Sequence, residues 1–371
     1  MHIAIDCRYV RERPSGIGTY VEALVARLPA LAPSDVFLVW AHARAPHPLS
    51  RAGNVREAVV PIEPNSLWTI LFAGRYASFA GVDVFHGAHN LLPRRLPCPG
   101  VVTLHDVLPI EHPDLDRRGF VKDRYYPRAV GCALRHAARI IVTTGATADR
   151  LRTLVPGTAP RTRVVPLAAG GEFRPPADPA AARTRAASLV GAGPFVLVVG
   201  QHSATKRHEA AVRAFASHVA APWRLVLVER QTARDPLAAL ARRLGISDRI
   251  VWLPHVSRPD LVMLLQTAAA LLQPSVYEGF GLPVVEAMAC GCPVVASDLP
   301  TLREVIGEAG LLVPVGDVDG FGRAAAALIA SPGRREELRE RGIARAAAFS
   351  WDRCARETLA VYREAAEQPA S

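Results

Sequence analysis

The chain has 371 residues, of which 50% are apolar and 21% charged, and its 44 Lys and Arg against 34 Asp and Glu give a formal net charge of +10. A single hydrophobic core stops growing at roughly 250–300 residues, so this length predicts two domains. The apolar share excludes an intrinsically disordered chain, and no apolar run approaches the ~20 residues that span a bilayer.

The N-terminal segment and the six cysteines bear on the compartment. His2–Asp6 reads as a first strand rather than as a signal peptide. The cysteines form no Cys-x-x-Cys pair and have no nearby histidine ligands, which argues against a zinc site and against a disulfide framework. We therefore expect a cytoplasmic protein with reduced, mostly buried cysteines.

The positive charge favours anionic partners such as nucleotides, phosphates, acidic lipids or nucleic acid. It does not choose among them, and an arginine-rich genome composition explains the excess equally well in a chain so rich in Ala, Arg and Pro. No repeat of basic and aromatic residues of the nucleic-acid-binding kind occurs, so nucleic acid is not an expected partner.

Strand-like and helical segments alternate along the first half of the chain. Amphipathic stretches such as Thr19–Leu28 and Phe120–Ala138 lie between short apolar runs. The expected strands are His2–Asp6, Val36–Trp40, Val55–Ile62, Val82–His86, Val101–His105, Ile140–Thr144 and Val164–Pro166. Alternation of this kind predicts an α/β fold with a parallel, doubly wound sheet.

The pattern breaks at Pro166–Pro179, a stretch with two glycines and several prolines that we interpret as the interdomain linker. It then restarts with the expected strands Phe195–Val199, Arg224–Glu229, Ile250–Leu253, Ala269–Gln273 and Pro293–Ser297. The predicted domains are residues 1–170 and 171–350, with 351–371 as a C-terminal helix that returns to the first domain. Two Rossmann-like domains facing a central cleft would place ligands beyond the carboxyl ends of their strands.

The segment from Ser275 to Gly291 carries the most specific motif. A buried strand precedes a glycine-rich turn, Pro283 suits the start of a helix, and Gly291 suits its end. The amides of such a turn and the helix dipole suit an anion, whereas Glu278 and Glu286 suit the hydroxyls of a sugar or ribose. Together they suggest a sugar nucleotide. The alternative is a tight turn, with Glu286 in the first helical turn favouring the dipole.

This segment, with its Gly-Phe-Gly-Leu-Pro and Glu-Ala-Met-Ala sequences, resembles the paired-glutamate motif of the family-4 retaining glycosyltransferases, which have the GT-B fold. The resemblance implies that Glu278 contacts the donor sugar and that Glu286 holds the nucleotide ribose. It also implies donor contacts, through amides that face the sugar and diphosphate, for the turn residues Gly279, Phe280, Gly281 and Leu282.

A second candidate for phosphate binding follows the first strand of the second half. Small residues lead to Lys206, which we expect at a helix start capped by Ser203 or Thr205, with a solvated lysine as the alternative. The spacing is not of the Walker type, which argues against a nucleoside triphosphatase. In the resembling family a lysine at this place binds the donor diphosphate. Where the family often has an arginine this chain has Gln201, so Gln201 and Arg207 are both candidates for the second diphosphate contact.

Two features of the first half complete the expected site. Gly16 and Gly18 follow the first strand, and they are no dinucleotide motif because Val21 stands where a third glycine is needed. By the resemblance they contact the donor from across the cleft; the alternative is a plain turn. His105 and Asp106 match the family's Thr-x-His-Asp pattern, which implies that His105 approaches the donor sugar and that Asp106 orients it or the loop. A core or capping histidine is the alternative.

Two further patterns concern metals and membranes. The triplets Asp114–Asp116 and Asp317–Asp319 lie in loops flanked by Pro or Gly and are better explained as turns, so no metal and no cofactor besides the nucleotide-sugar donor is expected. The stretch from Arg117 to Arg139 holds seven basic residues among apolar ones. It could contact an anionic membrane peripherally, on its inner face, or steer a lipid-diphosphate acceptor; a solvated outer face is the alternative.

The resemblance as a whole predicts a metal-independent, retaining glycosyltransferase of polysaccharide biosynthesis, in which His105, Asp106, Lys206 and Glu278 are catalytic. It would transfer a hexose, by our hypothesis mannose from GDP-mannose, to a glycan or lipid-linked acceptor through a same-face displacement. The leaving diphosphate would accept the acceptor's proton. A non-hydrolysing sugar-nucleotide epimerase on the same fold and a non-catalytic sugar-nucleotide binder are the alternatives.

Overall fold

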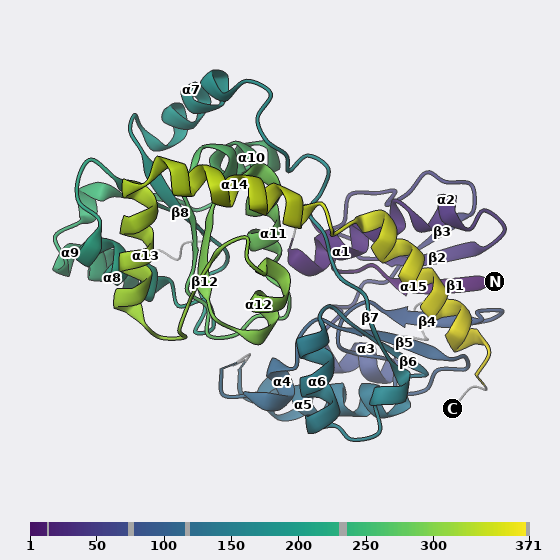
Figure 1. Cartoon of the computed structure of the whole chain (residues 1–371). Coiled ribbons are helices and arrows are strands. Elements are labelled where there is room, and N and C mark those ends of the chain that lie inside the picture. Colours follow the sequence, from purple (N-terminus) through teal and green to yellow (C-terminus); the bar gives the residue numbers. More distant parts are fainter. Residues whose placement is uncertain (13–14, 73–77, 116–118, 230–235, 369–371) are drawn as a thin grey trace. The chain divides into compact units, whose positions relative to one another are not determined.

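The structure, a computed structural model, describes residues 1–12, 15–72, 78–115, 119–229 and 236–368. The chain forms two compact units, one made of Met1–Leu167 with Ser350–Ser371 and the other of Ala168–Phe349 (Figure 1). Each has its own parallel sheet with helices in the connections, so the prediction of two doubly wound, Rossmann-like domains is confirmed. The expected cleft between the two domains stays a prediction.

Seven parallel strands form the sheet of the first unit within its described residues, in the order β3-β2-β1-β4-β5-β6-β7. They are β1 (His2–Asp6), β2 (Val36–Ala41), β3 (Val55–Val59), β4 (Val84–Gly87), β5 (Gly100–Leu104), β6 (Arg139–Val142) and β7 (Thr162–Val164). Every residue of β4 and β5 is buried, as expected for strands covered on both faces. The order reverses between β1 and β4, which is where doubly wound sheets place ligands.

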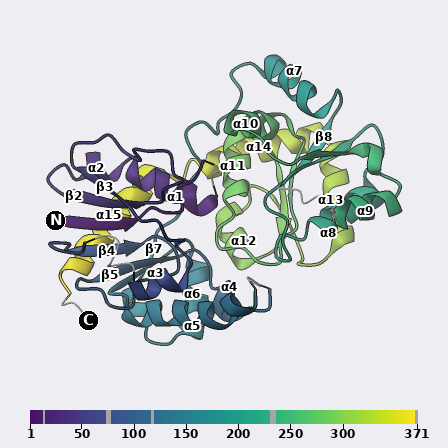
Figure 2. The same cartoon turned by 180° about the vertical axis from the view of Figure 1, so that it is seen from behind.

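The helices of the first unit include one from the end of the chain. They are α1 (Gly16–Val25), α2 (Leu28–Leu31), α3 (Leu67–Phe72), α4 (Leu108–Glu111), α5 (Phe120–His136), α6 (Gly145–Leu154) and α15 (Trp351–Ala366). Helix α15, drawn in yellow, lies against this unit (Figures 1 and 2). Arg139 donates to Glu364 over 2.9 Å and Arg27 to Asp352 over 2.6 Å, so ion pairs hold both ends of α15.

Six parallel strands form the sheet of the second unit, in the order β10-β9-β8-β11-β12-β13 across the residues that are described. They are β8 (Phe195–Val199), β9 (Arg224–Val228), β10 (Ile250–Leu253), β11 (Leu271–Gln273), β12 (Val294–Ser297) and β13 (Leu311–Val313). The helices are α7 (Pro179–Val190), α8 (His208–His218), α9 (Pro236–Arg243), α10 (Arg258–Thr267), α11 (Leu282–Cys290), α12 (Pro300–Ile306), α13 (Val318–Ala330) and α14 (Pro332–Ala346). The strand order reverses between β8 and β11, so the loops that follow these two strands lie at the expected ligand-binding edge.

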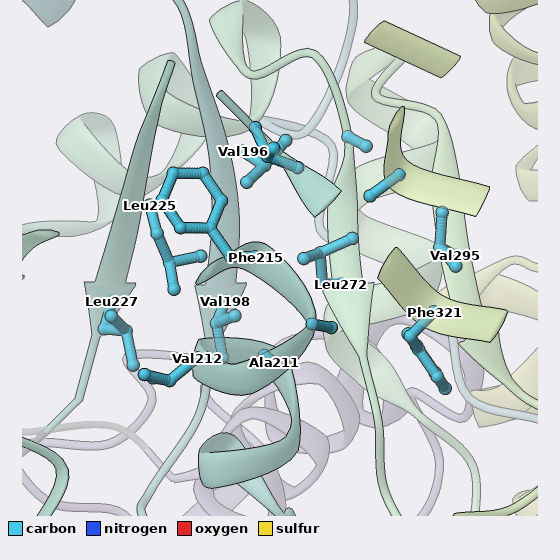
Figure 3. Packing of buried hydrophobic residues seen from close by; sticks show 14 of the residues in the cluster. Val196, Val198, Ala211, Val212, Phe215, Leu225, Leu227, Leu272, Val295 and Phe321 are labelled. Atoms are coloured by element: carbon cyan, nitrogen blue, oxygen red, sulfur yellow. The ribbon is translucent and has the colours of Figure 1, made fainter. Parts of the chain in front are cut away.

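The core of the second unit lies between its sheet and the helices α8 and α13 (Figure 3). Phe215 of α8 packs with Val196 and Leu225 of the sheet, and all three side chains are buried. Helix α13 approaches α8 closely because Gly322 has no side chain; a Cβ there would lie 2.9 Å from the carbonyl oxygen of Ala214. This packing fixes α8, and with it the loop that precedes α8.

Several predicted element ends are wrong for local reasons. Strand β3 ends at Val59 rather than at residue 62, because Pro61 has no N–H to continue the ladder. Helix α1 starts at Gly16, three residues early, because the Ser15 hydroxyl caps it by accepting from the amide of residue 18 over 3.1 Å. Thr144 does not end β6 but caps α6. Strand β13, Leu311–Val313, was not predicted.

The predicted linker runs over the observed division of the chain. The two units meet between Leu167 and Ala168, close to the predicted boundary at residue 170. The first helix of the second unit, α7, begins at Pro179. Asp178 caps it by accepting from the amide of Ala180 over 2.8 Å.

Candidate functional site

The turn between β11 and α11 is built to present backbone amides. Gly281, the residue before α11, has a φ of +93°, and a Cβ there would lie 2.7 Å from Leu302 Cδ2, so only glycine fits. No side chain caps the start of α11, Pro283 has no N–H, and the amide of Val284 donates to the Gly281 carbonyl oxygen over 2.9 Å, so the amide of Leu282 is the one that this helix start can offer to an anion. The helix ends at Gly291 with a φ of +76°, as predicted.

Phe280 and Leu282 were expected among the donor contacts. The Phe280 side chain is buried and packs edge-on against Phe349, with ring centroids 5.6 Å apart. It therefore anchors the turn, and only its backbone is free to face a ligand. Leu282 is half-buried at the start of α11, beside the half-buried Gly279.

Glu278 is the centre of a hydrogen-bond cluster. Lys206 Nζ donates to both of its carboxylate oxygens, over 2.7 and 2.8 Å. Gln273 Nε2 and Ser275 Oγ donate to Oε1 over 2.6 and 2.7 Å, and the hydroxyl of Thr301 donates to the Glu278 carbonyl oxygen over 2.9 Å. Charge-assisted bonds of this kind are the strong ones, so the carboxylate has a fixed position at the end of β11.

Lys206 reaches Glu278 from the loop after β8. The backbone amide of Val276 donates to the Thr205 carbonyl oxygen over 2.8 Å, which joins this loop to the turn after β11. The predicted cap by Ser203 or Thr205 is wrong: their hydroxyls bond to each other over 3.0 Å, and α8 begins only at His208. The structure thus brings Lys206 and Glu278 together although 72 residues separate them.

The two candidates for a second diphosphate contact flank Lys206. Gln201 is exposed. Arg207 has a φ of +48° and its Nε lies 2.5 Å from Glu209 Oε1. An ion pair this exposed is worth little, so Arg207 can exchange it for a phosphate. A diphosphate contact stays a prediction for both Gln201 and Arg207.

Glu286 is buried in the second turn of α11. The prediction that Glu286 lies in the first turn is wrong, because the helix begins at Leu282 and no acidic residue lies in its first turn. Burial raises the pKa of Glu286 to about 8, with Arg258 lowering it and Glu172 raising it by their charges. At neutral pH the carboxyl is therefore mostly protonated, and it can donate as well as accept a hydrogen bond.

His105 follows directly after β5 in the first unit. Its Nε2 lies 3.0 Å from the carbonyl oxygen of Ala88, so Nε2 carries the proton and Nδ1 keeps a lone pair. Its backbone amide donates to Asn90 Oδ1 over 3.2 Å, and its ring meets Tyr20 edge-on with centroids 5.1 Å apart. Burial lowers the pKa of His105 to about 4, so the ring is neutral at physiological pH.

The other expected residues of the first unit shape loops. Asp106 Oδ1 accepts from the amide of Leu108 over 3.0 Å and so forms the turn into α4. A Cβ at Gly18 would lie 2.9 Å from the Tyr9 carbonyl oxygen, so this glycine allows α1 to pack on the segment after β1. Gly16 is exposed at the first position of α1. Close packing therefore explains Gly18 without a ligand, whereas it does not explain Gly16.

A buried hydrogen-bond network near His105 was not predicted. His86 Nδ1 lies 2.7 Å from the hydroxyl of Tyr362 in α15, and His86 Nε2 lies 2.8 Å from Thr103 Oγ1. Tyr20 joins through a 3.0 Å bond to Thr103. Burial, helped by the nearby His105, lowers the pKa of His86 to about 3. The network ties α15 to the strands that place His105, and no sequence signal connects positions 276 residues apart.

Metal ligands and membrane spans are both absent from the described part of the chain. There, no group of three His, Cys, Asp or Glu residues is placed to hold a metal ion, and no helix is long and apolar enough to cross a bilayer. Asp317 caps α13 by accepting from the amide of Gly320 over 2.7 Å, and Asp114 lies in a turn, while Asp116 lies outside the described residues.

The basic stretch is described only in part. Arg117 and Arg118 lie outside the described residues, as does the side chain of Lys122. Within α5, three arginines are exposed, namely Arg124, Arg128 and Arg135. Arg139 instead pairs with Glu364.

Two family profiles match the chain in succession. Residues 14–168 match Glycosyltransferase Family 4, and residues 183–345 match Glycosyl transferases group 1. The chain belongs to glycosyltransferase family 4. Between them the two profiles match most of the described elements from α1 to α14, and the first match ends at residue 168, one residue beyond the observed division of the chain.

Curated relatives agree with this family, and solved structures share the fold. O-antigen chain mannosyltransferase B of Escherichia coli is 28% identical over 294 residues, which are 76% of this chain and 74% of that protein. A D-inositol 3-phosphate glycosyltransferase of Acidothermus cellulolyticus is 35% identical over 62% of this chain, and the match spans only 54% of that enzyme. Among solved structures, sucrose-phosphate synthase of Thermosynechococcus elongatus has a TM-score of 0.80 at 23% identity, covering 98% of each chain. Anabaena HepE in complex with UDP and glucose has a TM-score of 0.74 at 18% identity, covering 97% of this chain and 98% of its own.

Proposed function

We propose that this family-4 protein transfers a hexose from a nucleotide-diphosphate sugar, without a metal ion and with retention at the anomeric carbon. The observation that carries the proposal is the Lys206–Glu278 contact at the uncapped start of α11. A cation and the amide of Leu282 at this helix start suit the diphosphate, and a fixed carboxylate suits sugar hydroxyls. The nucleotide sugar would thus lie across the ends of β8 and β11.

Donor binding requires Lys206 to turn from Glu278 toward the diphosphate. Glu278 keeps its place during this exchange because Gln273 and Ser275 still donate to its Oε1. When the glycosidic bond breaks, negative charge grows on the leaving diphosphate, and Lys206 with the Leu282 amide stabilises it. The leaving oxygen then takes the proton of the attacking acceptor hydroxyl on the same face of the sugar.

GDP-mannose is the proposed donor and a glycan or lipid-linked sugar the proposed acceptor. The E. coli relative, an O-antigen chain mannosyltransferase, supports mannose and a polysaccharide acceptor. HepE, a neighbour in fold alone, binds UDP and glucose, which makes UDP-glucose the competing donor.

A panel of nucleotide sugars tests the proposal. The full chain is titrated with GDP-mannose, UDP-glucose and the free nucleotides; a bound ligand at 100 times its Kd stabilises the fold by ~2.7 kcal/mol. Mass spectrometry of the donor and of candidate acceptors then separates transfer from epimerisation of the donor. Binding of a nucleotide sugar with neither reaction, over a broad acceptor panel, would favour the non-catalytic binder.

Peripheral contact with an anionic membrane belongs to the same proposal. On α3, the large apolar side chains of Leu67, Trp68 and Leu71 are 45%, 60% and 44% exposed. Their neighbour Thr69 faces inward, where the fully buried Arg8 donates to its hydroxyl over 3.0 Å. The segment before α3 touches α5, because the hydroxyl of Tyr125 donates to the carbonyl oxygen of residue 65 over 2.7 Å. An apolar surface beside the exposed arginines of α5 suits the interface of an acidic bilayer.

Cosedimentation with lipid vesicles tests this contact. The parent should bind vesicles that contain phosphatidylglycerol and not those of phosphatidylcholine alone, and Trp68→Ser should weaken binding. Leu189→Ser, which changes an apolar side chain 37% exposed on α7, is the matched control and should leave binding unchanged. Equal binding by all three proteins would remove α3 from the membrane contact.

A further inference from the structure

A buried histidine–carboxylate pair lies beside the Lys206 loop. His208, the first residue of α8, is 2% exposed, and its Nδ1 lies 2.7 Å from Oε2 of Glu229, which directly follows β9. The second oxygen, Glu229 Oε1, is buried without a hydrogen-bond partner among the described residues. Burying a carboxylate with one oxygen unpaired is costly, so packing alone is a poor reason for the pair.

Glu229 fixes how the ring of His208 lies. An ionised carboxylate oxygen can only accept, so Nδ1 of His208 carries the proton that it donates. The opposite ring atom, Nε2, points to the end of β8, since a Cβ built at Gly200 would lie 3.9 Å from it. The ring of His202 stacks on that of His208 with centroids 5.7 Å apart and planes 16° apart. The oriented ring therefore lies against the His202 ring and close to Gly200, where the loop from Gly200 to Arg207 begins.

Turn bonds also hold this loop where it enters α8, because the amides of Lys206 and Arg207 donate to the Ser203 carbonyl oxygen over 3.1 and 3.4 Å. Its last residue, Arg207, lies in the left-handed region, and no side chain caps the helix there. Upstream, the amide of Val276 bonds to the Thr205 carbonyl oxygen, and the amide of Gly200 bonds to the last residue of β9 over 3.1 Å. Lys206 is thus placed between a backbone bond on one side and the His208–Glu229 pair on the other.

We infer that His208 and Glu229 are a positioning pair for the reaction: the Nδ1–H to carboxylate bond locks the start of α8 and so sets where the Lys206 ammonium lies. This inference rests on the proposed function, because it concerns the cation that meets the donor diphosphate. The pair touches neither the donor nor the acceptor. Its loss should therefore lower kcat through Lys206 and change the KM of the acceptor little.

Two substitutions of His208 separate the effect of its hydrogen bond to Glu229 from the effect of losing the ring. In His208→Asn the amide nitrogen can take the place of Nδ1 and keep the bond to Glu229, whereas in His208→Gln the amide reaches the place of Nε2 instead. A misplacement of about 1 Å can cost on the order of 100-fold in rate, so we expect kcat to fall about 10- to 100-fold in His208→Gln and clearly less in His208→Asn. Glu229→Leu should resemble His208→Gln.

The matched control lies at the other end of the same helix. His218 Nε2 lies 3.2 Å from Asp319 Oδ1, a histidine–carboxylate contact that is partly exposed and remote from Lys206 in the chain. His218→Gln should leave kcat unchanged. All variants are assayed as full chains well below their unfolding temperatures, which are measured alongside.

The outcomes separate this inference from the proposed function. If the parent binds neither GDP nor UDP and transfers no sugar, the proposed function fails. If the parent is active and His208→Gln keeps its kcat, or His208→Asn falls as far as His208→Gln, the positioning pair is refuted. An active parent, an impaired His208→Gln and a largely rescued His208→Asn support it.

Discussion

Replacing Lys206 by alanine is the sharpest test of the donor site. The Lys206 side chain is 23% exposed, and its ammonium bonds to both oxygens of Glu278, whose side chain is 6% exposed. Two donors, Gln273 and Ser275, remain on Glu278 after the change, so its carboxylate stays placed and the unit should fold. What disappears is the cation that meets the growing charge of the leaving diphosphate.

Because that charge is larger in the transition state than in the ground state, the effect should fall on turnover. Removing one electrostatic donor of this kind lowers kcat about 10²- to 10³-fold, and we expect Lys206→Ala to lie in this range with a smaller change in donor KM. Lys206→Arg should recover only part of the loss. A planar guanidinium can hold Glu278 in two parallel bonds and so leaves it less readily than an ammonium does.

Steady-state kinetics at saturating donor, with transfer followed by mass spectrometry, measure the effect. Arg213→Ala is the control, because it removes another cation of α8 that is exposed and should leave kcat unchanged. A kcat for Lys206→Ala within about twofold of the parent would refute the reasoning, since the solvated-lysine alternative predicts no change.

Four further predictions concern Glu286, Gly281 and the proposed independence of metal ions. The pKa of Glu286 in the folded protein, about 8, lies above the ordinary 4.5, so its contribution to the free energy of unfolding is present below pH 4.5 and is lost as the pH rises to 8. In chemical unfolding curves, Glu286→Gln should make the free energy of unfolding depend less on pH over this range. Glu286→Ala should weaken nucleoside-diphosphate binding about 10- to 100-fold in calorimetry, as expected for losing two hydrogen bonds to the ribose hydroxyls of ~0.5–1.5 kcal/mol each, and unchanged affinity would contradict its ribose role. EDTA should leave transfer intact, whereas loss of activity restored by magnesium or manganese would show that a metal takes part. Gly281→Ala should lower the melting temperature and abolish nucleotide binding, because the φ of +93° and the nearby Leu302 exclude a side chain. The control Gly333→Ala, which has open space around it, should do neither.

The sequence predicted the architecture well where apolar runs are long and bounded by glycine or proline. Strands β1, β8 and β10 have the predicted bounds, and β8 and β10 end directly before Gly200 and Pro254. Errors fall where one residue decides the end, as with the Ser15 cap and Pro61. The error on Glu286 is of the same kind. The helix was predicted to start at Pro283 but starts at Leu282, so Glu286 lies in its second turn rather than in its first.

The contacts inside the site could not be predicted, because they join positions far apart in the chain. Lys206 meets Glu278 only because β8 and β11 are neighbours where the strand order reverses. Gln273 offered a weak signal, as an amide that ends a buried apolar strand. His86 offered none, since its partner Tyr362 belongs to the last helix of the chain.

One compositional signal for Lys206 lies in the residue type itself. Of the 44 basic residues in this chain only two are lysines, Lys122 and Lys206, so arginine stands almost everywhere that a surface cation suffices. A compositional bias toward arginine acts on every exposed position alike, and a lysine that persists against it marks a place where arginine does not serve. At Lys206 the structure supplies a physical reason. The ammonium has three rotatable donors on a flexible stem and holds the two carboxylate oxygens of Glu278 at 2.7 and 2.8 Å. It can turn from them to a phosphate, whereas the planar guanidinium of an arginine would first have to give up two parallel bonds. The rarity of lysine and the geometry of its contact therefore point independently to a cation that must change partners during the reaction.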